Sequence, residues 1–335
     1  MPQHLTLRAR RFGCAVLLGV AVAGCSMNSS TTPSSNAQLG TSPAASLRRS
    51  ELLSRGFGTV SSHRAQSSGW IAPDAKKKKK ALIYWGSYDA STIDVFSAKG
   101  TNPPEKGQIT TGLSNPERLF VDKSLSVYAT NLGNNTITAY KRGAATPFLT
   151  ISDGVNTPTG LTVDAAGTVY CANVGNDTIT EYPKGQTAPS LTIPTFAEYL
   201  AVDAQDNLYA SGASAVYEFA PGSTTGKNLN LNIGSPGALE VDKSGNVIVI
   251  DEAANSIDVF PAGQTQSSKK VSVTAGSAFA LTLNKSEAAL YVTVEVSGAF
   301  IVQQLDYPNG SSLTNKISGT NYGEWPIAAS PDSVL

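Results

Sequence analysis

The chain has 335 residues, and its 25 Lys and Arg are balanced by 25 Asp and Glu, so its formal net charge is zero. The charges are divided unevenly, because residues 26–80 carry a net charge of +7 and residues 81–335 a net charge of −10. An acidic body argues against nucleic-acid binding, and three cysteines are too few for a disulfide framework. The 255 residues from 81 to 335 are enough to form a hydrophobic core without such cross-links.

The N-terminus has the order of segments that is typical of an export signal. Arg8, Arg10 and Arg11 form a basic region, and an apolar stretch follows at 12–23. A helix needs about twenty apolar residues to span a bilayer, so this stretch is too short to do so. We therefore expect a cleaved signal peptide.

The tetrapeptide Val-Ala-Gly-Cys that ends at Cys25 resembles the lipobox of bacterial lipoproteins. In that family the cysteine is lipidated and the signal is cleaved before it. The resemblance implies a signal peptide at 1–24 and a membrane partner reached through the lipid on Cys25. It also implies an extracytoplasmic location on the cell envelope, at the outer membrane if the source has two membranes, because Ser26 rather than Asp follows the cysteine. The alternative is an ordinary secretory signal with a cysteine at this place by chance.

The segment at 25–80 is expected to be a disordered, basic tether that begins with the lipidated cysteine. It is rich in Ser, Thr, Gln and Ala and shows little hydrophobic periodicity. Five consecutive lysines at 76–80 end it. Such a run is most often a solvated linker. The alternative is attraction to anionic lipid head groups, to which each basic residue contributes about 1 kcal/mol.

From residue 81 onwards one short phrase recurs, with the pattern x-Leu-x-Val-Asp in four copies and a degenerate fifth. The copies end at Asp122, Asp164, Asp203, Asp242 and Asn284, in steps of 42, 39, 39 and 42 residues. A fixed period in this range is typical of repeat architectures. Each period holds four short apolar runs separated by Gly, Asn, Asp and Pro, which predicts four strands joined by turns.

Four-stranded units of about forty residues predict the blades of a β-propeller, which avoids exposed sheet edges by closing into a ring. Six copies of the second strand indicate six blades, and they begin at Leu82, Val127, Val169, Leu208, Val247 and Leu290. The first copy has no first strand before it, but residues 325–331 form a sixth version of the phrase. We therefore predict an all-β fold at 81–335, a six-bladed propeller of four-stranded antiparallel blades whose ring is closed by the C-terminal strand. The pattern resembles NHL-repeat proteins and the wider six-bladed propeller group, which includes gluconolactonase-like enzymes.

The repeat also locates a candidate ligand or metal site. In a four-stranded meander, the start of the first strand and the end of the second strand lie at the same end of the blade. Ring closure brings these ends together around one mouth of the central channel. The candidate residues at this mouth are Glu117, Glu198, Glu324, Asn131, Asn173 and Asp251.

Two interpretations compete for these residues. Asn131, Asn173 and Asp251 are expected to form hydrogen bonds with their own loops. The three glutamates would instead converge on a divalent cation such as calcium, through oxygen ligands. Glu324 is followed by Trp and Pro, which resembles the Glu-Gly-Pro with which gluconolactonase-like propellers place a metal-binding glutamate. The other ligand motifs of that family are not matched here.

Catalytic motifs are scarce in the repeats. Streptogramin-lyase-like propellers use a histidine as general acid or base, but the two histidines here, His4 and His63, lie in the signal and the tether. No nucleophile elbow, phosphate loop or dinucleotide fingerprint is present. Cys171 is a lone cysteine in a strand-like run, where we expect a small buried side chain.

These patterns favour a monomeric, non-catalytic binding or scaffold module, whose channel-mouth loops take a protein or a small-molecule ligand. One alternative is a metal-dependent hydrolase of the lactonase type. Another is a structural envelope protein without a specific ligand.

Overall fold

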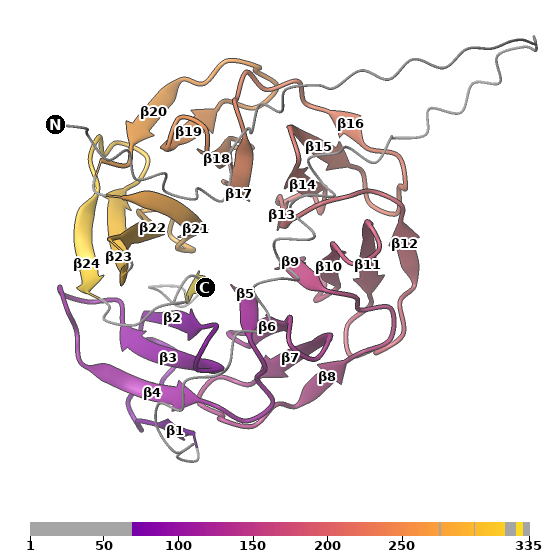
Figure 1. Ribbon diagram of the computed structural model, residues 1–335. Helices are drawn as coiled ribbons and strands as arrows, with labels where there is room; N and C mark the ends of the chain where they lie inside the picture. The colour runs from indigo at the N-terminus through magenta and orange to yellow at the C-terminus, as the bar shows by residue number, and fades with distance from the viewer. Residues whose placement is uncertain (1–68, 275, 298, 319–325, 331–335) are drawn as a thin grey trace, which may run out of the picture. The chain divides into compact units, whose positions relative to one another are not determined.

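The computed structural model describes residues 69–318, apart from 275 and 298, and residues 326–330. These residues form six antiparallel sheets, which follow one another around a central axis in chain order (Figure 1). The predicted signal peptide, Cys25 and most of the tether lie outside the described residues. No helix in the described ranges is long and apolar enough to cross a membrane.

Blades 2 to 6 each consist of four consecutive strands. Blade 2 contains β5 (Pro116–Val121), β6 (Val127–Asn131), β7 (Thr136–Tyr140) and β8 (Leu149–Ile151). Blade 3 contains β9 (Pro158–Val163), β10 (Val169–Asn173), β11 (Thr178–Tyr182) and β12 (Leu191–Ile193). Blade 4 contains β13 (Tyr199–Val202), β14 (Leu208–Gly212), β15 (Ala215–Phe219) and β16 (Lys227–Asn228). Blade 5 contains β17 (Pro236–Val241), β18 (Val247–Asp251), β19 (Ser256–Phe260) and β20 (Lys269–Ser272). Blade 6 contains β21 (Ser277–Leu283), β22 (Ala289–Val296), β23 (Ala299–Asp306) and β24 (Thr314–Ser318).

Blade 1 is built from both ends of the described chain. Its central strands are β2 (Leu82–Ser87), β3 (Thr92–Ser97) and β4 (Glu105–Ile109), and β25 (Ile327–Ala329) lies beside β2 on the inner edge. This closure confirms the all-β, six-bladed propeller that was predicted from the repeats.

A fifth strand, β1 (Trp70–Ile71), pairs with the outer edge of β4 and places Trp70 opposite Gln108. Blade 1 therefore begins upstream of residue 81, where the sequence predicted that the tether ends and the propeller starts. The reason is that an apolar pair can add to an exposed sheet edge without a periodic pattern of its own.

The last residue of the repeated phrase holds the turn between the first and second strands. In blade 3, Asp164 Oδ1 accepts the backbone N–H groups of Gly167 and Thr168, both at 2.8 Å. Its Oδ2 accepts the hydroxyl of Tyr170 at 3.2 Å. In the other copies, a side-chain oxygen of the equivalent residue accepts the backbone N–H of the residue four positions later. These equivalent residues are Asp122, Asp203, Asp242 and Asn284. The phrase recurs because each of blades 2 to 6 uses this cap for the turn between its first two strands.

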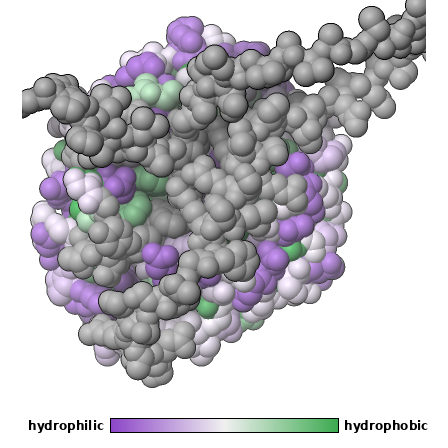
Figure 2. All heavy atoms as spheres, in the orientation of Figure 1, coloured by the Kyte–Doolittle hydropathy of each residue, from purple (hydrophilic) through white to green (hydrophobic). Residues whose placement is uncertain are grey.

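The cores lie between adjacent blades. The leucine of the phrase is buried in every copy, as Leu161 and Leu239 show. The aromatic residue that ends the third strand is buried as well, in Tyr140, Tyr182, Phe219 and Phe260. Figure 2 shows that the described residues on the visible face are mostly hydrophilic or neutral, with scattered hydrophobic ones. Most hydrophobic side chains are thus buried between the blades, as the packing of blades in a ring requires.

Candidate functional site

A β-bulge interrupts the innermost strand of most blades at the residue before the repeated phrase. In blade 2 the register steps from Pro116 to Arg118 and leaves Glu117 out of the pairing. Similar shifts occur at Thr159 in blade 3, at 237–238 in blade 5 and at Phe279 in blade 6. A bulge re-aims the extra side chain and recurs beside functional sites. The innermost strands lie nearest the axis (Figure 1), so these bulges form a ring at the predicted mouth.

Asn131 and Asn173 each bind the connection that leads into their blade at the mouth, as well as a threonine of their own blade. Asn131 Oδ1 accepts the N–H of Ser114 at 3.1 Å, and its amide donates to Thr138 Oγ1 at 3.0 Å. Asn173 makes the corresponding bonds, to the N–H of Asn156 at 3.0 Å and to Thr180 Oγ1 at 2.9 Å. Both asparagines are fully buried. Their polar groups are therefore used within the blade.

Asp251 has the same position in blade 5 and a similar role. Its carboxylate accepts the N–H groups of Gly234, Ser235 and Ala253, each at 3.1 Å. Blade 4 has Gly212 at this place, and a Cβ there would lie 3.0 Å from a ring carbon of Phe196. In blade 4, packing against Phe196 thus takes the place of a side-chain hydrogen bond from this position.

Neighbouring blades are also tied together at the mouth. Asn135 has a φ of 53° and accepts the N–H of Thr157 in the next blade at 2.7 Å. Asn255 has a φ of 51° and accepts the N–H of Ala278 at 3.3 Å. Asparagine tolerates this left-handed conformation better than other side chains do. Hydrogen bonds therefore connect the loops that surround the mouth, both to their own blade and to the neighbouring blade.

An arginine that the sequence analysis did not select reaches across the inner strands. Arg118 of blade 2 is 5% exposed, and its guanidinium carbon lies 4.9 Å from the ring centroid of Tyr199 in blade 4. Its charge also acts on Glu240 of blade 5. Side chains from three blades thus meet near the axis. The other copies have Gly, Tyr or Ala where Arg118 stands in the phrase, and this departure was the available signal.

Burial raises the pKa of Glu240 to about 7, although Arg118 and a backbone hydrogen bond from Leu283 oppose the shift. The folded state therefore holds this proton more tightly than the unfolded state does. Protonated Glu240 therefore contributes to the free energy of unfolding. This contribution is fully present below the ordinary pKa of about 4.5, and it is lost as the pH rises through about 7 and the carboxyl group ionises.

We expect Glu240→Gln to gain stability relative to the wild type as the pH rises from about 4.5 to about 8. The gain should reach roughly 2 kcal/mol, because the variant lacks the carboxylate that must ionise in a desolvated position. Urea unfolding at several pH values measures the difference. A difference that does not change with pH would contradict the assignment.

Two of the three glutamates that were predicted to bind calcium are among the described residues. Glu117 and Glu198 are 8% and 7% exposed, whereas Glu324 lies outside the described ranges. Within those ranges no group of three or more His, Cys, Asp or Glu is arranged to hold a metal ion. Calcium takes six to eight oxygen ligands, so Glu117 and Glu198 do not form a site by themselves. The metal site stays a prediction that depends on Glu324.

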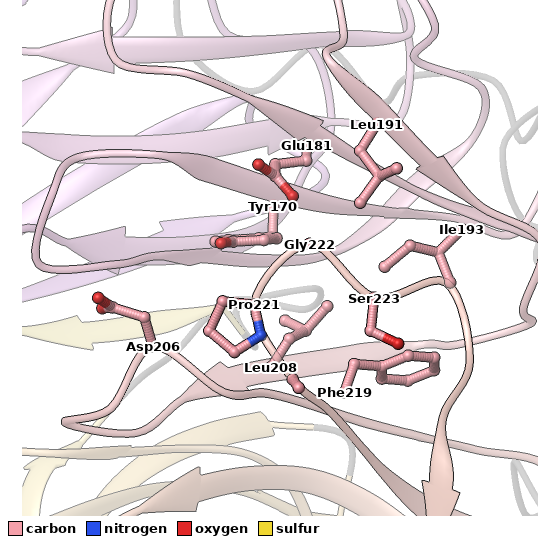
Figure 3. Close-up of a pocket in the computed structure, with 11 residues that line it drawn as sticks. Tyr170, Glu181, Leu191, Ile193, Asp206, Leu208, Phe219, Pro221, Gly222 and Ser223 are labelled. Carbon is pink, nitrogen blue, oxygen red and sulfur yellow. The ribbon is translucent and has the colours of Figure 1, made fainter.

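A shallow pocket lies between blades 3 and 4, away from the mouth (Figure 3). Its lining includes the polar residues Tyr170, Glu181 and Asp206 and the apolar residues Leu191, Ile193 and Phe219. Burial and the charge of nearby Asp164 raise the pKa of Glu181. Tyr170 is already bound to the turn cap of its own blade. The pocket is therefore an opening between two packed blades, lined by residues that the fold uses.

No protein-family model and no curated protein match the sequence. A chain from the crystal structure of the nidogen/laminin complex superposes with a TM-score of 0.63 and 16% identity, covering 76% of this chain and 100% of that chain. The catalytically inactive virginiamycin B lyase from Staphylococcus aureus, solved with quinupristin, gives 0.49 and 9%, covering 74% and 87%. The chain has the fold of a six-bladed β-propeller. At these identities the similarity shows the fold alone.

Proposed function

We propose that the protein is a non-catalytic binding module, lipid-anchored on the cell envelope, which presents the loops of one channel mouth to a partner. The observation that carries this proposal is the hydrogen bonding of those loops. Asn131 and Asn173 hold the connections that lead into their blades, and Asn135 and Asn255 bind the backbone of the next blade. A surface that is ordered before binding costs little conformational entropy when a partner arrives.

The chemistry of the mouth favours a partner with cationic or hydrogen-bonding groups. Glu117 lies at the bulge of blade 2, and Glu198 has the corresponding position in blade 4, immediately before β13. In blade 5 that position is Gly237, and a Cβ there would lie 2.5 Å from Glu252 Oε1, so Glu252 fills the space. Acidic groups on an acidic body attract basic partners over a distance.

Blade 3 adds uncharged groups to the inner strand. The hydroxyls of Thr159 and Thr162 are buried and have no hydrogen-bond partner among the described residues. A buried hydroxyl that lacks a partner costs free energy, and a polar ligand could supply the missing bond. Thr159 lies at the start of β9, at the mouth, and supports a polar group of a ligand or partner there, whereas Thr162 lies near the other end of the strand.

Site-specific photo-crosslinking in the source cells tests the binding proposal. A photoreactive amino acid at the exposed mouth positions Asn134, Asn176 or Ala253 should give a defined crosslinked product. The matched controls lie on the same three blades at the opposite end, and they are Ser124, Ala166 and Ser244. Equal yields at both ends, or no product from the mouth, would contradict the proposal.

Anchoring rests on the Val-Ala-Gly-Cys tetrapeptide that ends at Cys25. Two or three acyl chains are enough for stable membrane attachment. Full-length Cys25→Ala protein should therefore move from the membrane fraction to the soluble fraction after cell lysis. Retention in the membrane fraction would count against lipidation.

A further inference from the structure

Two exposed aromatic side chains distinguish one part of the propeller from the rest. Trp70 and Phe148 are the exposed large hydrophobic residues of the described chain, and each is 45% exposed. Trp70 belongs to the added strand β1 of blade 1, and Phe148 immediately precedes β8 of blade 2. Aromatic rings of this kind are favoured at the boundary between water and lipid head groups.

The segments that carry these two rings lie side by side. A Cβ at Gly69 would be 3.0 Å from Ala145 Cβ, and a Cβ at Gly143 would be 2.6 Å from Lys76 Cγ. Arg142 also donates a hydrogen bond to the carbonyl of Lys80. Segments 69–80 and 141–148 therefore form one continuous surface at the junction of blades 1 and 2.

This surface is strongly basic, although the propeller is acidic. All five lysines at 76–80 are exposed. Lys141 adds a sixth positive charge, and its Nζ lies 3.6 Å from the ring centroid of Phe148. The carboxylate of Asp74 is paired with Lys106 at 3.0 Å. We define the basic-aromatic patch as Trp70, Lys76, Lys77, Lys78, Lys79, Lys80, Lys141 and Phe148.

The lysines of the patch lie at the end of the blades opposite the mouth, and Trp70 lies on the outer edge of blade 1 beside Gln108 of β4. The turn at 141–147 joins the third strand to the fourth, and the lysines at 76–80 precede the second strand β2. In the meander both places are at the end where the first strand finishes. A surface that held the patch would therefore leave the mouth loops facing away from it.

We propose that the basic-aromatic patch docks on an anionic membrane surface and orients the channel mouth outwards. The inference rests on the proposed anchoring, because residues 69–80 continue the tether that starts at Cys25. Lysines are attracted to anionic head groups, and the two rings enter the head-group region beside them. Lipid attachment alone would leave the propeller free to rotate on its tether, and the patch restricts that rotation.

Vesicle sedimentation of the full-length Cys25→Ala chain, which cannot be acylated, tests the patch directly. We expect stronger binding to vesicles that contain phosphatidylglycerol than to pure phosphatidylcholine, and we expect high salt to remove the difference. Replacing the five lysines at 76–80 by Gln should weaken binding to the anionic vesicles at least about tenfold. Trp70→Ser with Phe148→Ser should weaken it as well, through loss of the inserted rings.

The matched control replaces five other lysines by Gln, so that the change in net charge is the same. These lysines lie on blades 2 to 6 and are Lys123, Lys184, Lys227, Lys243 and Lys285. Four of these lysines lie in turns at the same end of the propeller as the patch, but each of the five stands on a different blade. The control should therefore weaken binding to anionic vesicles much less than replacement of the five consecutive lysines does. Equal binding by the parent to both kinds of vesicle, or equal weakening in the control, would overturn the proposal. All the replaced lysines lie at the surface, and thermal unfolding will show that each variant is folded.

The two membrane proposals fail in different ways. Retention of Cys25→Ala in the cellular membrane fraction, together with failure of the lysine variant to change vesicle binding, would contradict both. If Cys25→Ala is released but the lysine variant binds anionic vesicles like its parent, the anchor stands and the patch is wrong. If the patch variants lose vesicle binding while cellular retention does not need Cys25, the patch stands without the lipid.

Discussion

Lys270→Thr should lower the free energy of unfolding by about 3 kcal/mol, although Lys270 lies on an outer strand with half of its side chain exposed. The Nζ of Lys270 lies 2.6 Å from Asp258 Oδ2, and the Asp258 side chain is completely buried. The hydrogen bond to Asp258 and the charge of Asp251 raise the pKa of Lys270. Loss of the ammonium would leave a buried carboxylate without its compensating charge. The expected value lies at the lower end of the range for a broken buried pair, because water reaches the lysine.

Comparison among blades explains why blade 5 needs this lysine. In blade 2, Asn131 donates to Thr138, which lies opposite Thr150 on β8. Blade 3 repeats this arrangement with Asn173, Thr180 and Thr192. Blade 5 has Asp251, Asp258 and Lys270 at the same three positions. Two carboxylates and one ammonium thus replace a neutral hydrogen-bonded set.

The comparison also suggests a variant in which the lost stability should be restored. The triple variant Asp251→Asn, Asp258→Thr and Lys270→Thr recreates the neutral set and should unfold within about 1 kcal/mol of the wild type. Lys227→Thr is the matched control, because Lys227 pairs across the same two strands of blade 4 with Glu218, at 3.3 Å. The Glu218 side chain is 25% exposed, so the control should cost less than about 1 kcal/mol. Urea unfolding measures all three, and a triple variant as unstable as Lys270→Thr would refute the explanation.

The predictions that succeeded are those that depend on local hydrogen bonding repeated in each blade. Asp164 and its counterparts mark a turn that the backbone requires, so their spacing revealed the number of blades. The C-terminal version of the phrase could be placed beside β2 because a ring has one missing inner strand. Such features depend on the chemistry of a few neighbouring residues, which a sequence displays directly.

The contacts that the sequence did not reveal join residues from different blades. Arg118 approaches Tyr199 and Glu240 only because the ring brings blades 2, 4 and 5 around one axis. Gly69, which precedes β1, lies against Ala145 of blade 2, and a strand of two residues has no period to detect. These contacts depend on ring geometry, and a pattern within one repeat contains no information about them.

Closure of the ring depends on the short strand β25, and Ile327→Ala should therefore destabilise the whole propeller. Ile327 is 1% exposed and pairs with Trp85, in a core cluster that also includes Val302 of blade 6. Hydrogen bonds connect Ser330 with Leu82 in both directions, each at 2.8 Å. Truncating an isoleucine in a packed core costs about 2–5 kcal/mol.

We expect about 3 kcal/mol for Ile327→Ala, with a single unfolding transition, because the cluster joins the first and last blades. Ile71→Ala is the matched control, since β1 and β25 are both short strands at the edges of the sheet of blade 1. Ile71 lies on the outer edge and is only partly buried, so its truncation should cost less than half as much. The difference follows from position: β1 covers an edge that the ring does not need, whereas β25 supplies the inner strand that connects blade 6 to blade 1. Urea unfolding of both variants measures the difference, and equal losses would mean that β25 contributes packing without closing the ring.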